Sequence, residues 1–444
     1  MSNKIQESNT QVTLDKIVSL CKRRGFVFPS ADIYGGINGL YDFGNLGYLM
    51  KENIKNSWKK SIQNEKGDIF FLDGSLIGPH AMWTASGHVE NFHDPMVDCM
   101  NCKKRFRTDD DNINLEKPCP SCGIKSWTDI RDFNLMFQTN LGAVADDSAK
   151  AYLRPETAQT IFVQFKNIWS TSRTKLPFGV AQIGKAFRNE ITPKQFLFRM
   201  REFEQMELEW FCKDENSMDM FNFWVEKRQE FYKSIGLDMN RIRMYQHPQE
   251  KLSHYSKCTF DVEYEFPFGF KELEGIAHRG TFDLTQHSKF SGKDLAVFDQ
   301  ETGKSEIPTV VECSVGVERL FLTILFDAYH EDVMDNETRT VLKLHPTIAP
   351  IKAAVLPLMK KISEPAEKLY KELKNQFQSI DYDESGSIGK RYRRQDEIGT
   401  PVCFTIDFQT VEDQTITARM RDTGAQERIH LSQAAEYLSK VING

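Results

Sequence analysis

The stretch FRNEITPKQFLFRMREFEQME, residues 187–207, decides the fold that we expect for this chain. Side chains on a strand alternate between its two faces, so residues at a spacing of two share a face. Five side chains suit one antiparallel hairpin: Arg188, Glu190, Arg199, Arg201 and Phe203. Charged and apolar residues stay mixed from Phe196 to Phe211, and this density of charge predicts strands that line a polar cleft.

The side chains of this hairpin suit a nucleotide. An arginine offers a planar pair of donors to a phosphate, a carboxylate accepts from the adenine amino group, and an aromatic ring stacks on a base. A salt-bridged strand pair on a solvated face would use the same residue types. From the chemistry of the residues alone, both interpretations stay open.

The run GVAQIGKA, residues 179–186, imitates the phosphate loop of P-loop nucleotidases. Its last position is Ala186, which has no hydroxyl group for magnesium. Residues 187–191 are typical of a strand, whereas a P-loop must be followed by a helix whose N-terminus holds the phosphates. We therefore reject a P-loop, and any bound ATP must be held by side chains.

Length and composition indicate an ordinary globular protein with more than one domain. The chain has 444 residues, of which 40% are hydrophobic and 27% are charged. The polar N-terminus lacks the apolar stretch of a signal peptide, and the longest mainly apolar run, Leu320 to Phe326, is too short to span a membrane. We expect a cytoplasmic protein with no membrane partner.

The net charge of −6 speaks against a nucleic-acid partner unless basic residues gather locally. Three basic runs do so: Lys22–Arg24, Lys103–Arg107 and Lys390–Arg394. We expect the last of them to be a loop that binds nucleic acid, although an ordinary solvated surface explains each run equally well.

Four of the nine cysteines form two pairs, Cys99-x-x-Cys102 and Cys119-x-x-Cys122, separated by sixteen residues. This spacing is typical of two knuckles that give zinc four tetrahedral thiolates. Four thiolates leave no position for water, so the pattern predicts a structural Zn²⁺ rather than a catalytic one.

Periodicity predicts regular elements along the chain. Before residue 330 they are a helix over 50–62, a helix over 214–236 with Asp, Asn and Ser capping candidates, a buried strand over 309–313 and a buried helix over 316–329. Two prolines in residues 344–350 then break the pattern. Beyond them we expect strands over 352–356, 401–407 and 416–420, a helix over 363–378 with a Ser cap, and a closing helix from Ser432.

Four segments together resemble the homodimeric glycyl-tRNA synthetases, a family of class II aminoacyl-tRNA synthetases. They are the hairpin FRNE…REFEQME as motif 2, LRPETAQ at 153–159, ELEGIAHRG at 272–280, and ECSVGVER at 312–319 as motif 3. The similarity extends to CKRRG at 21–25, ASGHV at 85–89 and GSIGKRYRRQDEIG at 386–399, and it follows the family's order over nearly the whole chain.

The resemblance implies a fold and an activity. The fold is α+β: a class II antiparallel sheet flanked by helices in residues 1–345, with a zinc-knuckle insertion at 97–127, and an α/β anticodon-binding domain in residues 346–444. The activity is glycine–tRNA ligation, in which ATP activates glycine as glycyl-adenylate and the glycyl group passes to the 3′ end of tRNA(Gly). The implied partners are ATP, glycine, tRNA(Gly), Mg²⁺ and a second copy of the chain.

The resemblance also implies site residues. The catalytic pair is Arg188, on the α-phosphate, and Arg319, on the γ-phosphate. The ATP-binding set is Arg188, Asn189, Glu190, Phe198, Arg199, Met200, Arg201, Glu202, Phe203, Glu272, Leu273, Gly316 and Arg319. The glycine-binding set is Arg107, Glu156, Phe203, Glu207, Arg279, Glu312 and Ser314, and the magnesium carboxylates are Glu272 and Glu312.

The chain departs from the family pattern at three places. Asn45 stands where the motif 1 region usually has proline, Thr160 replaces a glycine, and Met420 replaces an aspartate. Two other functions remain: an amino-acid-activating paralogue that does not charge tRNA, and a non-catalytic subunit on the same fold. The C-terminal domain disfavours the first, and the arginines of motifs 2 and 3 disfavour the second.

Overall fold

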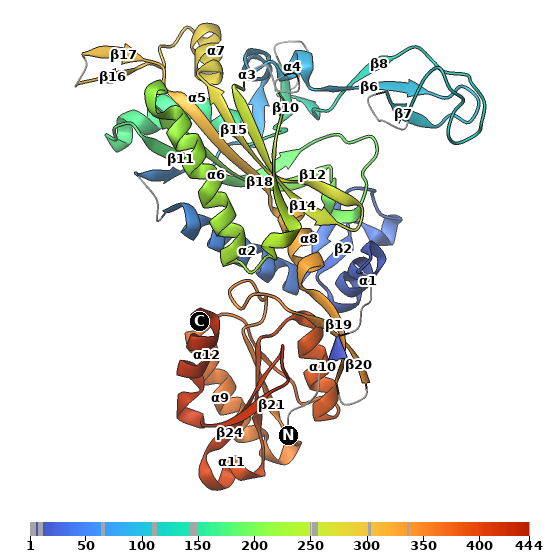
Figure 1. The fold of residues 1–444 in the computed structure, drawn as a ribbon, viewed down its shortest axis with the longest axis vertical. Coiled ribbons are helices and arrows are strands. Elements are labelled where there is room, and N and C mark those ends of the chain that lie inside the picture. The colour runs from blue at the N-terminus through green and yellow to red at the C-terminus, as the bar shows by residue number, and fades with distance from the viewer. Residues whose placement is uncertain are drawn as a thin grey trace.

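The computed structural model describes residues 6–7, 12–63, 67–108, 113–142, 149–248, 250, 256–300, 303–334 and 337–443. A large upper unit is built on a twisted sheet, and a smaller lower unit holds the C-terminal part of the chain (Figure 1). No helix among these described residues is long and apolar enough to cross a membrane.

A seven-stranded sheet is the centre of the upper unit, with the order β13-β14-β15-β18-β12-β11-β4. Its strands are β4 (Ile69–Phe71), β11 (Phe178–Phe187), β12 (Glu202–Cys212), β13 (Ile242–Gln246), β14 (Cys258–Phe266), β15 (Gly269–Gly280) and β18 (Thr309–Gly316). Only the pairing of β4 with β11 is parallel. The antiparallel sheet and the β11–β12 hairpin confirm the predicted fold.

One face of this sheet is covered by helices whose apolar sides share a core: α1 (Leu14–Arg24), α2 (Asn45–Gln63), α6 (Ser217–Ser234) and α8 (Val317–Ala328). In α2 the predicted stripe of Ile54, Trp58 and Ile62 is fully buried. Helix α8 is apolar nearly all round because it is enclosed between the sheet and α2. The predicted helices and the strand before α8 are therefore confirmed.

The other face carries α5 (Ala158–Ser172) and α7 (Phe282–Ser291), which pack on β11, β12 and β18 through a second cluster of phenylalanines and aliphatic residues. Short elements complete this side: β5 (Ile77–Pro79), α3 (His80–Ala85), α4 (His88–Asn91), β9 (Gln138–Asn140), β10 (Lys150–Leu153), β16 (Val297–Asp299) and β17 (Lys304–Glu306). The face between them stays open in part, and the site lies there. The hairpin of β2 (Val27–Pro29) and β3 (Tyr41–Phe43) belongs to the first face, where Phe43 packs on Phe321 of α8.

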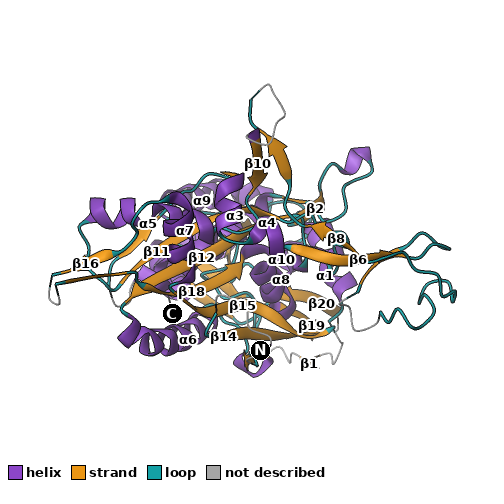
Figure 2. Ribbon diagram, turned by 90° about the horizontal axis from the view of Figure 1, so that it is seen from above, coloured by secondary structure: helices purple, strands orange, loops and turns teal. Residues whose placement is uncertain are grey.

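The cysteine-bearing insertion is a three-stranded arm that extends away from the sheet in both views (Figures 1 and 2). Its strands are β6 (His93–Asp98), β7 (Arg105–Arg107) and β8 (Arg131–Asn134), in the order β7-β6-β8. The two knuckles lie beyond these strands, so the arm supports them at a distance from the main sheet.

The lower unit contains a five-stranded mixed sheet in the order β22-β21-β23-β24-β25. Its elements are β21 (Ala353–Pro357), α9 (Ser363–Gln376), β22 (Ile380–Tyr382), α10 (Ile388–Ile398), β23 (Val402–Ile406), α11 (Phe408–Asp413), β24 (Thr415–Met420), β25 (Gln426–His430) and α12 (Ala434–Asn443). The predicted strands and helices of this unit are present. The predicted Ser cap is wrong, because Ser363 is the first helical residue and its hydroxyl donates to Glu384.

The hairpin of β19 (Tyr329–Met334) and β20 (Glu337–Leu342) joins the two units, with β1 (Gln6–Glu7) at its edge. Arg339 of β20 donates to Asp332 at 2.7 Å and to Asp396 of α10 at 3.0 Å, and all three side chains are buried. The expected basic loop at 390–394 is in fact the middle of α10. The prediction of a loop is therefore wrong, because the run lies within a helix whose arginines contact the fold, as described below.

Candidate active site

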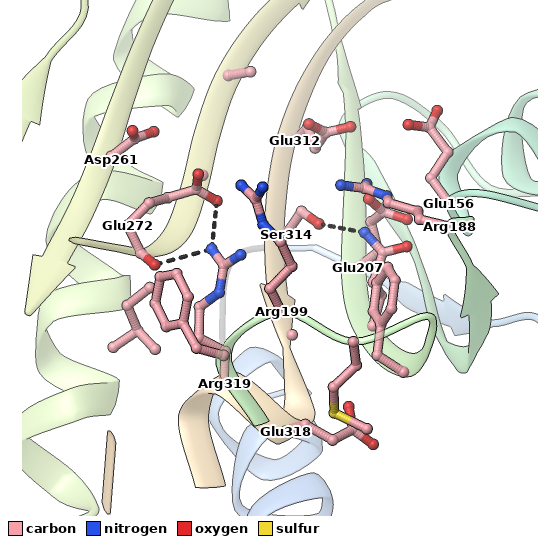
Figure 3. A pocket seen from close by; sticks show the side chains of 18 of the residues that line it. Glu156, Arg188, Arg199, Glu207, Asp261, Glu272, Glu312, Ser314, Glu318 and Arg319 are labelled. Carbon is pink, nitrogen blue, oxygen red and sulfur yellow. Dashed lines mark hydrogen bonds and ion pairs between the residues drawn. The ribbon is translucent and has the colours of Figure 1, made fainter. Parts of the chain in front are cut away.

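A cavity of about 440 Å³ lies on the open face of the central sheet, between the strands and the loop that joins β11 to β12. Fifteen predicted site residues line it: Glu156, Arg188, Glu190, Phe198, Arg199, Met200, Phe203, Glu207, Glu272, Leu273, Arg279, Glu312, Ser314, Gly316 and Arg319. Figure 3 shows their charged groups converging from both sides, with Glu272 on one side and Glu156 and Arg188 on the other.

Sheet register brings these residues together from distant parts of the sequence. Glu207 of β12 pairs with Ser314 of β18, which pairs in turn with Gly275 of β15. One step along, Glu209 pairs with Glu312. Because alternate residues of a strand face one side, these two rows form the floor of one cavity.

Arg188 lies just beyond the end of β11. Its Nε donates to the carbonyl oxygen of Pro155 at 3.1 Å, and its guanidinium lies 5.3 Å from the ring centre of Phe203 and 5.4 Å from that of Phe92. The backbone N–H of Arg188 also donates to Arg201. These contacts fix the arginine on the cavity wall, where a planar cation suits a phosphate.

Glu190 follows two residues later. Burial raises the pKa of its carboxyl, while Arg199 and Arg188 oppose the shift. Arg201 donates to the backbone oxygen of Glu190 at 3.0 Å, so this arginine holds the loop and does not line the cavity. The carboxyl group of Glu190 is therefore partly desolvated at the cavity wall, where it can form hydrogen bonds with a ligand.

Arg319 is in the first turn of α8, opposite Arg188. It donates to the Glu272 carboxylate at 3.0 Å and to the Glu272 backbone oxygen at 2.9 Å, and its guanidinium lies 4.6 Å from the ring centre of Phe198. Arg188 and Arg319 therefore lie on opposite walls of the cavity, each beside an aromatic ring, and Arg199 and Arg279 also line it.

The floor between the two arginines is acidic. Glu207, Glu209 and Glu312 place carboxylate oxygens within 4.8 Å of one another. Burial, with the neighbouring carboxyls of Glu312 and Glu156, raises the pKa of Glu207 to about 8. Burial and Glu312 likewise raise the pKa of Glu209 well above its usual value. Three buried carboxyls at this spacing favour a cation between them.

The pKa of Glu156 is shifted in the opposite direction from those of Glu207 and Glu209. Burial opposes its ionisation, but His88, Arg279 and Gln159 together hold the pKa of its carboxyl well below the ordinary value. Its nearest basic group is the ring of His88, with Nε2 at 3.3 Å from Glu156 Oε2. The site thus combines one carboxyl whose pKa is lowered, Glu156, with neighbouring carboxyls whose pKa values are raised.

Four predicted residues do not line the cavity: Asn189, Arg201, Glu202 and Arg107. Glu202 pairs with Lys185 at 2.8 Å on the other side of the hairpin, and Arg107 of β7 pairs with Asp94 at 3.1 Å. A spacing of one residue along a strand turns a side chain to the opposite face, which explains Glu202.

Sequence reasoning missed part of the cavity wall. His247 Nε2 lies 2.7 Å from Asp261 Oδ2, and both side chains line the cavity with Gln205. Gly275 and Ala277 keep the floor open between this pair and Ser314. The only signal for Asp261 was its place as the first of three acids that alternate with β-branched and aromatic residues in CTFDVEYEF.

The four cysteines of the insertion converge as predicted, with their sulfurs within 4.8 Å of one another. Cys99 Sγ lies 3.6 Å from Cys122 Sγ, and Cys102 Sγ lies 3.8 Å from Cys119 Sγ. The residue after each second cysteine, Lys103 or Gly123, has positive φ and donates its N–H to the first cysteine of its pair. Two matched turns around four sulfurs fit a tetrahedral metal site.

The family models match both units of the chain. The model of the class II tRNA synthetase core domain (G, H, P, S and T) matches residues 137–328, and that of the anticodon binding domain matches residues 352–441. Together with the antiparallel sheet and its two cavity arginines, these matches define a class II aminoacyl-tRNA synthetase.

Curated relatives identify the family within this class. The chain is 50% identical to the glycine–tRNA ligase of Caldanaerobacter subterraneus, covering 97% of this chain and 98% of the relative. It is 51% identical to that of Treponema denticola, covering 94% and 95%, and 49% identical to that of Bifidobacterium longum, covering 97% and 93%. The chain belongs to the glycine–tRNA ligase family.

Proposed function

We propose that this chain joins glycine to tRNA(Gly) in two steps at the cavity, with ATP as the activating substrate. The observation that carries the proposal is the meeting of Arg188, Arg319 and the floor carboxylates in one cavity. The glycine carboxylate attacks the α-phosphorus of ATP, the bond to pyrophosphate breaks, and glycyl-adenylate forms. A hydroxyl of the terminal tRNA adenosine then attacks the glycyl carbonyl, and AMP leaves.

Arg188 neutralises the α-phosphate and Arg319 the γ-phosphate, while Phe203 stacks on adenine and Glu190 accepts from its amino group. Phe198, Arg199, Met200, Leu273 and Gly316 complete the lining of the proposed ATP site, whereas Asn189, Arg201 and Glu202 support it from outside the lining. No covalent enzyme intermediate is required, so catalysis consists of positioning and charge neutralisation.

Glycine is recognised through its two charged ends and its lack of a side chain. Glu156, Glu207, Glu312 and Ser314 surround the ammonium group, and Arg279 faces the carboxylate or the phosphates. Arg107 belongs to the proposed set but pairs with Asp94 outside the cavity lining. Every competing amino acid is larger than glycine, so crowding on the floor excludes it without an editing step.

Magnesium would be held by Glu272 and Glu312, whose oxygen donors both line the cavity and suit a hard cation. Magnesium supplies charge neutralisation on the triphosphate when it is bound. Zn²⁺ would be held by Cys99, Cys102, Cys119 and Cys122, in support of the fold of the arm rather than of the reaction.

A zinc test follows from the matched turns. Cys119→Ser should lose the metal and loosen the arm, because thiolate ligation supplies much of the folding free energy of a short segment. Elemental analysis of the purified protein measures zinc, and limited proteolysis measures the order of the arm. A variant that keeps one zinc per chain and resists the protease equally well would contradict the assignment.

We further propose that the chain acts as a homodimer. Ile33 and Tyr34 are 89% and 87% exposed, and Tyr48 of α2 is 57% exposed, close to the motif 1 region. Large apolar side chains exposed together favour a protein interface. Sedimentation analysis of the wild type and of a Tyr34→Glu variant would test this assembly.

The proposed domain limits are residues 1–345 for catalysis, with 97–127 as the insertion, and residues 346–444 for the anticodon. They are supported by a separate apolar cluster in the lower unit that begins at Ala353. All nine cysteines are free thiols, which fits the proposed cytoplasmic location.

The decisive experiment is pyrophosphate exchange into ATP, measured with glycine, alanine or serine. We expect exchange with glycine alone, followed by charging of tRNA(Gly) when the tRNA is added. Exchange that is equal with alanine would contradict glycine selection. Exchange without charging would favour the amino-acid-activating paralogue.

A further inference from the structure

Gln159 of α5 lies behind the cavity and does not line it, and its side chain is 1% exposed. Its Nε2 donates to Glu156 Oε1 at 3.1 Å and to Asp283 Oδ1 at 3.0 Å. Its Oε1 lies 2.8 Å from His287 Nε2. One buried amide thus uses both of its donor hydrogens and its acceptor on three functional groups.

The orientation of this amide is forced by its partners. Two carboxylates can only accept hydrogen bonds, so the NH₂ group of Gln159 must face them. Its oxygen then faces His287, which must donate from Nε2. Burial lowers the pKa of His287, in agreement with a neutral ring.

Both carboxylates held by Gln159 lead into the cavity. Glu156 lines it directly. Asp283 receives Arg279 through two hydrogen bonds of 2.8 and 2.9 Å, and Arg279 donates to Glu312 at 2.6 Å. The amide therefore connects a carboxylate at the start of α5 with a charged pair on β15 and β18.

We propose that Gln159 is a positioning residue that fixes the distance between Glu156 and the Arg279–Glu312 pair, and that His287 acts through it. Glu156, Arg279 and Glu312 surround the proposed glycine subsite, whereas the ATP-facing Arg188 and Arg319 make no hydrogen bond to Gln159 among the described residues. This inference rests on the proposed function. It predicts that loss of Gln159 raises the Michaelis constant for glycine and leaves the Michaelis constant for ATP unchanged.

Gln159→Met tests the proposal, because methionine has similar length but neither donates nor accepts here. The Michaelis constant for glycine in pyrophosphate exchange should rise roughly tenfold or more, since hydrogen bonds to charged groups are lost. The Michaelis constant for ATP should not change. Gln164→Met is the matched control, because Gln164 is an exposed glutamine of the same helix.

Gln159→Glu keeps the shape of the side chain, so a change in the Michaelis constant for glycine in this variant does not arise from altered packing. It replaces the NH₂ group, which donates to both carboxylates, with an acceptor oxygen, and the Michaelis constant for glycine should rise at least as much as in Gln159→Met. Thermal melting of each full-length variant identifies any that fails to fold. A glycine constant unchanged in the folded Glu variant overturns the proposal.

A double-mutant cycle tests the role of His287. His287→Leu alone should raise the glycine constant, but it should add little in the Gln159→Met background. Full additivity would show that His287 does not act through Gln159. If the wild type shows no glycine-dependent exchange, the proposed function fails; if it does and both Gln159 variants match it, only this inference fails.

Discussion

The arginines of the cavity and those of α10 differ in what surrounds them. Arg188 and Arg319 line the cavity with partners that leave them on its walls. Arg391 of α10 is 2% exposed and donates to the backbone oxygens of Asp383 and Leu358 at 3.1 and 3.3 Å. Arg188 and Arg319 also bond to the protein, but they do so at the wall of a cavity that a ligand can enter, whereas Arg391 is enclosed by the fold.

The other basic residues of the same run are also engaged. Arg394 pairs with Asp383, and Arg393 donates to the backbone of Met334 at 3.1 Å, across the junction of the two units. From the other unit, Arg23 and Arg24 at the end of α1 pair with Glu397 of α10. Two of the three basic runs therefore stabilise the junction of the units.

We expect the largest effect on activity from removing an arginine of the cavity. Arg188→Ala should lower glycine-dependent pyrophosphate exchange by ~10²–10³, because a positioned donor to the reacting phosphate is lost. Its folding should be unaffected, since among the described residues the Arg188 side chain hydrogen-bonds only to the backbone oxygen of Pro155 on the cavity wall. Exchange kinetics and a thermal melt measure the two effects.

Lys175→Ala provides the control, because Lys175 is an exposed cation of the same unit, outside this cavity. It should leave exchange unchanged. Near-normal exchange in Arg188→Ala would remove this arginine from the site.

The junction should show the opposite pattern, with a loss of stability and no direct loss of chemistry. Asp396 accepts from Arg339 at 3.0 Å and from Arg419 at 2.9 Å, and all three side chains are buried. Asp396→Asn leaves two buried cations short of one charge, which typically costs about 3–5 kcal/mol. Urea unfolding of the full chain measures the loss.

Glu436→Gln is the matched control for a charge removed from the same unit, because its ion pair with Lys440 is exposed. We expect no measurable change in stability from it. An Asp396→Asn protein as stable as this control would show that the buried network does not hold the units.

A smaller effect is expected from Arg391→Met, which removes donors to backbone oxygens but leaves no buried acid unpaired. Loss of such charged hydrogen bonds costs about 1.5–3 kcal/mol. The Michaelis constants for glycine and ATP should not change, since Arg391 lies outside the cavity. An altered glycine constant with unchanged stability would instead give Arg391 a functional role.

The sequence predicted those features that depend on short-range patterns. The four-residue stripe of Ile54, Trp58 and Ile62 fixed α2, and the spacing of the cysteines fixed the knuckles. Most residues that line the cavity belong to the four segments that resemble the synthetase family. The failures depend on long-range pairing: Asp261 enters the cavity only because β14 registers Asp261 against Gly275. Arg391 of α10 donates to the backbone oxygens of Asp383 and Leu358, which precede it in the sequence and approach it only in the folded chain.

The smallest effect concerns Lys352, the cation in the link between the units, which unlike an arginine can release its proton. Lys352 Nζ donates to the backbone oxygens of Pro346 and Thr347 at 2.9 and 2.7 Å, and burial lowers its pKa from 10.5 to about 8. Below about pH 8 both the folded and unfolded chains hold this proton.

Between the two pKa values the unfolded chain holds more of the proton than the folded chain does, so the contribution of Lys352 to the free energy of unfolding rises with pH. The wild type should therefore gain stability relative to Lys352→Met as the pH rises from about 7.5 to about 10, because all other titrating groups are common to both proteins. Urea unfolding of both proteins across this range measures the difference, and a difference that stays flat or falls would contradict the lowered pKa.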